Sequence, residues 1–125
     1  MDQAILVSPD IEIGRDAVEA LDKAGLEPTV AMMAVFPEYG DWRFVVASPE
    51  LDQKHTLRAY EQVAGVLRGD FVSRLPVTMV LRTKDAFVRE LHKIFGKTQS
   101  VEGMRLGGQM IGNRFVDHAY VYRIK

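Results

Sequence analysis

Two short segments of the chain are apolar at every position. One reads Val-Ala-Met-Met-Ala-Val-Phe over residues 30–36, and the other reads Phe-Val-Val-Ala over residues 44–47. Successive side chains of a strand point to opposite faces of its sheet, so a strand with one wet face alternates apolar and polar residues. Both faces around these segments must therefore be covered, either by helices on both sides or by helices on one side and a second copy of the chain on the other.

The periodicity of the remaining residues predicts the elements around this hairpin. The expected order is a helix that carries Ala17 to Ala24 and is capped by Ser8 or Asp10, strands over 29–36 and 42–47, a helix over 52–68, a strand over 75–82, a helix over 84–95, and strands over 104–111 and 114–124. A glycine follows each helix, and Gly112-Asn113 is typical of a two-residue hairpin turn. The sequence therefore predicts one α+β domain over residues 1–125, with about five mostly antiparallel strands and three helices.

Length and charge limit the possible partners. A chain of 125 residues buries one core, and sixteen basic against seventeen acidic residues leave a formal charge of -1. This balance disfavours nucleic acid as a partner and supplies no polybasic membrane patch. No apolar run approaches the about 20 residues that span a bilayer, and Ala4–Val7 is too brief for the apolar core of a signal peptide. We expect a cytoplasmic protein without membrane contact.

The stretch FVVASPELDQKH, residues 44–55, places several polar side chains directly after a strand. Asp52-Gln53-Lys54 has the carboxylate-x-lysine spacing of metal-dependent nucleases of the restriction-enzyme type, with Glu50 or Asp41 as the second acid. In those enzymes the pair lies on a strand, whereas here it follows one. The simpler interpretation, which we favour, is that Ser48-Pro49 ends the strand and Asp52 caps the next helix.

The histidines supply two further hypotheses. His55 and Asp52 are candidates for a general base and its orienting carboxylate, but no nucleophile motif accompanies them, and an exposed histidine in a first helical turn is the simpler interpretation. The three histidines, His55, His92 and His118, lie on separate elements without the spacing of a zinc site. With no cysteine in the chain, the sequence predicts neither a metal nor a cofactor.

The last strand carries a row of aromatic side chains. Strict alternation places one set of residues on a single face: Val116, His118, Tyr120, Tyr122 and Ile124. Together with Trp42, the three rings of this row are candidates for the wall of a small-molecule pocket. The alternative, which we favour, is a half-buried sheet face whose polar tips reach water or backbone.

Gly107-Gly108 lies inside the preceding strand. No helix follows it, so a phosphate-binding loop is disfavoured, and paired glycines in a strand more often mark a bulge or a close approach of another backbone.

The segments Asp41–Pro49 and Asp117–Arg123, with Asp52 and Ala59-Tyr60 between them, resemble a group of short bacterial proteins that are generally described as hypothetical. The resemblance implies no reaction, cofactor or site residue. From the residues themselves we expect a small non-enzymatic binding or interaction module that forms a homodimer. The alternatives are a metal-dependent nuclease that uses residues 41–54 and a small-molecule-binding domain with an aromatic pocket.

Overall fold

A computed structural model of the chain describes residues 8–125, so the segment Ala4–Val7 lies outside the described part. The elements are α1 (Ser8–Lys23), β1 (Val30–Val35), β2 (Trp42–Ala47), α2 (Pro49–Asp52), α3 (Thr56–Val66), α4 (Asp70–Arg74), β3 (Val77–Leu81), α5 (Ala86–Phe95), β4 (Arg105–Ile111) and β5 (Arg114–Ile124). Within residues 8–125, no helix is both long and apolar enough to cross a bilayer.

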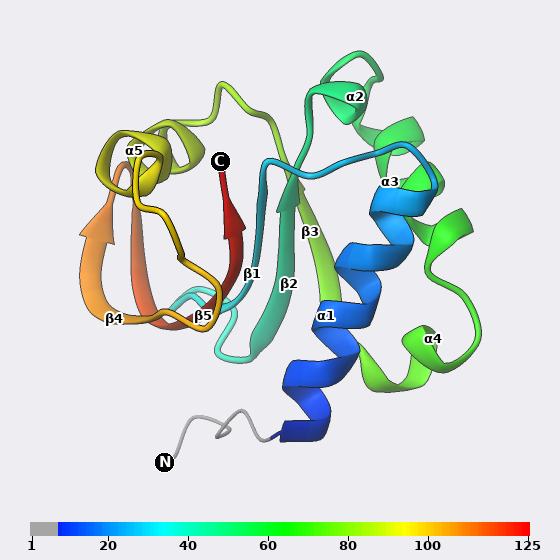
Figure 1. The fold of residues 1–125 in the computed structure, drawn as a ribbon, viewed down its shortest axis with the longest axis horizontal. Coiled ribbons are helices and arrows are strands. Elements are labelled where there is room, and N and C mark those ends of the chain that lie inside the picture. The colour runs from blue at the N-terminus through cyan, green and yellow to red at the C-terminus, as the bar shows by residue number, and fades with distance from the viewer. Residues whose placement is uncertain (1–7) are drawn as a thin grey trace.

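The strands form one sheet in the order β3-β2-β1-β5-β4 (Figure 1). The β2–β3 pair is parallel and the other three pairs are antiparallel. Three of the helices, α1, α3 and α5, are ten residues long or longer, and α2 and α4 are single short turns. The expected α+β class, with about five strands and three main helices, is confirmed.

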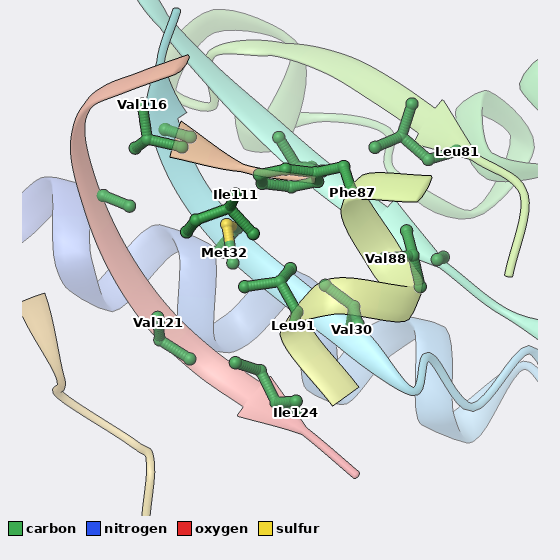
Figure 2. Packing of buried hydrophobic residues seen from close by; sticks show 14 of the residues in the cluster. Val30, Met32, Leu81, Phe87, Val88, Leu91, Ile111, Val116, Val121 and Ile124 are labelled. Carbon is green, nitrogen blue, oxygen red and sulfur yellow. The ribbon is translucent and has the colours of Figure 1, made fainter. Parts of the chain in front are cut away.

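The chain's own helices cover both faces of the apolar hairpin. Val30, Met32 and Ala34 of β1 pack in one cluster with α5, which we call the α5-side core, and Figure 2 shows the α5 side chains lying on the strands there. Ala31 and Met33 point the other way and pack with α1 and α3 in the α1-side core. Because both faces are already buried, the apolar strands no longer require a second copy of the chain, and the homodimer stays a prediction without that support.

The helix expected over 52–68 is wrong in its boundaries. A turn over residues 53–55 separates α2 from α3 because the Arg82 guanidinium donates to the carbonyl oxygens of Leu51, Asp52 and Lys54 at 3.0, 3.2 and 2.6 Å. The cap is also different, since Ser48 rather than Asp52 caps α2. Leu57, an apolar residue in the first turn of α3, has 65% of its surface exposed.

The segment before β3 contains α4, which lies between the helix and the strand that the sequence predicts. It is one short turn with no buried residue, so it carries no helical apolar stripe from which periodicity predicts a helix.

The row on β5 is interrupted by a β-bulge. Ala31 pairs with Arg123 but Met32 pairs with Val121, which leaves Tyr122 as an extra residue on β5. An extra residue reverses the alternation, so Ile124 packs in the α5-side core while Tyr120 and Tyr122 pack in the α1-side core. Val116 also lies in the α5-side core, so the predicted single face of five residues is wrong at both of its ends.

Helix α1 lies close to the sheet where it carries a glycine. A Cβ added to Gly14 would overlap the hydroxyl of Tyr122 and lie 2.8 Å from the terminal methyl of Met33. The Tyr122 hydroxyl passes beneath this point and donates to the Ile11 carbonyl at 2.8 Å. Glycine at position 14 therefore sets the distance between α1 and β5.

Substituting Gly14→Ala should destabilise the fold by about 2 kcal/mol, since an overpacked contact must be relieved by moving α1 or the tyrosine. Gly65→Ala on α3 is the matched control, because its added Cβ meets only the flexible end of Arg68 at 3.8 Å. That change should stabilise by about 0.5–1 kcal/mol through helix propensity. Urea denaturation measures both, and equal effects would contradict the close approach at Gly14.

Candidate functional site

The four residues of the nuclease hypothesis do not meet in one site. Asp41 directly precedes β2 and Glu50 lies in α2, beyond the other end of the strand, so the six strand residues, about 20 Å, lie between them. The Asp52 carboxylate accepts from the backbone N–H of Thr83 at 3.1 Å and from the Thr83 hydroxyl. Within residues 8–125, no three or more His, Cys, Asp or Glu side chains are grouped to hold a metal ion.

Lys54 and His55 lie in the turn between α2 and α3. The carbonyl of Lys54 accepts from Arg82, and His55 is the exposed N-cap residue of α3 without a side-chain cap hydrogen bond. The Asp52 carboxylate is already hydrogen-bonded to Thr83, across the gap to the β3–α5 loop. The contacts of Asp52 and Lys54 therefore hold the turn in place, and His55 lies exposed at its end.

The aromatic row is divided between the core and the surface. The rings of Tyr120 and Tyr122 lie edge to face, 5.2 Å between centroids, and both side chains are buried beneath α1. Burial raises the pKa of the Tyr122 hydroxyl above its ordinary value. His118 is exposed and its ring centroid lies 6.4 Å from that of Trp42. These rings do not form one continuous pocket wall.

A group of hollows surrounds Arg123 at the end of β5. Three hollows, of about 430, 240 and 290 Å³, share this residue in their walls. We call the first of them the Arg123 hollow, and its walls come from α1, the segments before β1 and after β2, and the end of β5. Its lining residues are Asp22, Glu27, Thr29, Pro49, Glu50, Arg123 and Lys125.

Arg123 is held rigidly by α1 and by the segment that follows it. Its two terminal nitrogens donate to the two carboxylate oxygens of Asp22, both at 2.8 Å, and one of them also donates to the Pro28 carbonyl at 3.1 Å. This forked geometry is the strongest arrangement for an arginine and a carboxylate. The hydrogen bonds from Arg123 lower the pKa of Asp22 below its ordinary value.

Glu27, also in the wall, has a backbone conformation that side-chain-bearing residues rarely adopt. Its φ of 33° is positive, and among the described residues it is the one non-glycine for which this holds. The carbonyls on either side of it are both fixed, since Leu26 accepts from the Ser48 hydroxyl and Pro28 accepts from Arg123. Two side chains from distant parts of the chain thus hold Glu27 in a strained conformation.

Ser48, the first of the polar residues that follow β2, has a structural role. Within the part of the chain whose burial is described, it is the one fully buried polar residue. Its oxygen accepts from the backbone N–H of Glu50 at 3.1 Å, and its hydroxyl donates to Leu26. The serine therefore ends the strand, caps α2 and fixes one wall of the Arg123 hollow.

The charges of the Arg123 hollow do not cancel. Asp22 and Arg123 neutralise each other, which leaves the carboxylates of Glu27 and Glu50 against the ammonium of Lys125. Neither glutamate has an ion-pair partner among the described residues. The hollow therefore carries one net negative charge and has two acceptor groups available to a ligand.

Sequence reasoning did not select Asp22, Glu27 or Arg123. A positive φ is expected at glycine or asparagine, so nothing in the sequence pointed to Glu27. The one available signal was Gly25, which marks the end of α1 and hence a sharp change of chain direction beside Glu27.

Comparisons with protein-family models, with curated proteins and with solved structures found no match.

The Asp22–Arg123 pair predicts a pH dependence. Because the folded pKa of Asp22 is lowered from 3.8, its contribution to stability is present above that pH and is lost as the pH falls through the lower folded value. Asp22→Asn should cost about 1 kcal/mol at neutral pH, with the difference from wild type shrinking below about pH 4. The exposed Asp16→Asn on the same helix is the control. A difference independent of pH, measured by urea denaturation, would contradict the ion pair.

Proposed function

We propose that this protein is a non-enzymatic binding module whose ligand site is the Arg123 hollow. The observation that supports the proposal most is the positive φ of Glu27, which lies in the wall of the hollow. Hydrogen bonds to the carbonyls of its two neighbours, Leu26 and Pro28, hold it there. Strain of this kind costs about 1–3 kcal/mol and persists where a site requires a particular side chain. Glycine at this position would avoid the strain but would supply no carboxylate.

The chemistry of the wall favours a small cationic or zwitterionic ligand. The carboxylates of Glu27 and Glu50 complement an ammonium or guanidinium group, and Lys125 complements an anionic group on the same molecule. Arg123 offers no unpaired charge to a ligand, because both of its terminal nitrogens donate to the Asp22 carboxylate. A volume of about 430 Å³ lies within the range of small-molecule sites.

The alternatives have less support from the geometry. A nuclease centre requires carboxylates that share one metal ion, or two metal ions about 4 Å apart, and residues 41 and 50 are at opposite ends of β2. An aromatic pocket requires open rings, and Tyr120 and Tyr122 are packed under α1. The binding module is therefore the function that the arrangement of side chains favours.

A diamine such as putrescine should raise the melting temperature of the wild-type protein, since a ligand that binds only the folded state stabilises it. The dicarboxylate glutarate should not. Glu27→Gln should weaken diamine binding roughly tenfold, about 1.4 kcal/mol, because it removes one of the two carboxylates. Glu38→Gln, the same change on the exposed β1–β2 loop, is the matched control. Calorimetric titration with the diamine measures the affinities. Equal affinity of the wild type, the Glu27→Gln variant and the Glu38→Gln variant would contradict the site.

The strain at Glu27 is tested separately by its removal. Glu27→Gly should leave the free energy of unfolding unchanged or raise it by up to about 1 kcal/mol, because glycine adopts positive φ freely but loses more entropy on folding. The β-branched Glu27→Val should lower it by about 1 kcal/mol or more. Denaturant unfolding compares the two variants. A glycine variant less stable than the valine variant would show that the backbone at position 27 is not strained.

A further inference from the structure

The two edge strands of the sheet, β3 and β4, differ in what lies against their outer sides. The β3 edge is reached by α3, whose Tyr60 hydroxyl accepts the backbone N–H of Val80 at 3.0 Å. The other edge is β4, the orange strand at the left of Figure 1, which pairs with β5 on one side. Within residues 8–125, no strand pairs with the outer side of β4. This edge therefore presents unpaired backbone donors and acceptors.

The composition of β4 does not protect it from pairing. Edge strands of monomeric proteins commonly carry charged side chains or proline, which oppose the addition of another strand. From Leu106 to Ile111 the strand has neither. Met110 is 62% exposed, and Phe115, its direct cross-strand partner on β5, is 38% exposed. The two side chains form an apolar pair beside the open edge.

The middle of β4 consists of two glycines, Gly107 and Gly108, which carry no side chain. A Cβ added to Gly108 would meet no atom within 4 Å, so this glycine is not required by packing inside the chain. Its φ of 63° is one that glycine adopts readily, and no side chain covers the backbone of residues 107 and 108. Glycines in a strand interior permit another backbone to come close.

We propose that β4 and the Met110–Phe115 pair form the surface through which two copies of this chain associate, with the two β4 strands antiparallel about a two-fold axis near Gly108. The one charge of the strand supports this arrangement. Antiparallel pairing places the two copies of Arg105 at opposite ends, about 20 Å apart, whereas a parallel pairing would set them side by side. A two-fold contact also closes after two copies and leaves neither β4 edge open.

The inference uses none of the residues of the Arg123 hollow and stands or falls independently of the proposed ligand. It is tested by light scattering on the full chain over a concentration series. The wild type should approach twice 14.1 kDa as its concentration rises. Met110→Lys should weaken the association at least tenfold, because it places a charge on the pairing edge. Val77→Lys, an equally exposed position on the β3 edge with 61% of its surface accessible, should leave it unchanged.

Hydrogen exchange of the wild type at low and high concentration supplies a readout that needs no variant. Amides of residues 106–110 should exchange more slowly at the high concentration. A wild type of 14.1 kDa at every concentration would overturn the proposal, as would equal effects of the two lysine variants. A dimer whose concentration-dependent protection lies outside β4 would also overturn it, since another surface would then form the contact.

Discussion

Burial of the central strand β1 on both faces is the constraint on which the rest of the structure depends. All six of its residues are buried, and it pairs with β2 on one side and β5 on the other. Such a strand needs a cover on each face, which α1 with α3 provides on one side and α5 on the other (Figure 1). Because both faces are apolar, charged side chains gather at the strand ends and sheet edges. The Arg123 hollow, at the end of β5, lies in such a position.

One extra residue in β5 connects the core to that site. The bulge directs Tyr122 and Arg123 toward the same side of the sheet, where Tyr122 packs beneath Gly14 and Arg123 binds Asp22. Regular alternation would direct Arg123 to the α5 side, away from its partner. The position of α1 over Tyr122 and the ion pair at its C-terminal end thus have a common cause. A substitution that shifts α1 should therefore also move Asp22 in the wall of the Arg123 hollow.

The parts of the fold that the sequence predicted are those determined by local pattern. β2 and β5 were predicted at their observed bounds, because apolar runs and turn residues mark them. The break between α2 and α3 could not be predicted, since it depends on Arg82, some thirty residues later in the chain. The bulge at Tyr122 arises from register against β1, which periodicity within β5 does not contain. The candidate site was missed for the same reason, as Asp22 and Arg123 are brought together only by the packing of α1 on the sheet.

The polar stretch after β2 shows how such a pattern can be mistaken for chemistry. Ser48 and Asp52 have the residue types of an active site, yet each is hydrogen-bonded to a distant segment, Leu26 and Thr83 respectively. Buried or half-buried polar groups need such partners, and a strand end beside a helix start offers many unpaired backbone groups. Glu27 differs from both residues. Its backbone is constrained by Ser48 and Arg123, while its carboxylate has no ion-pair partner among the described residues. The fold thus fixes the backbone of Glu27 but gives its exposed carboxylate no ion pair, and this contrast is what supports the proposed ligand site.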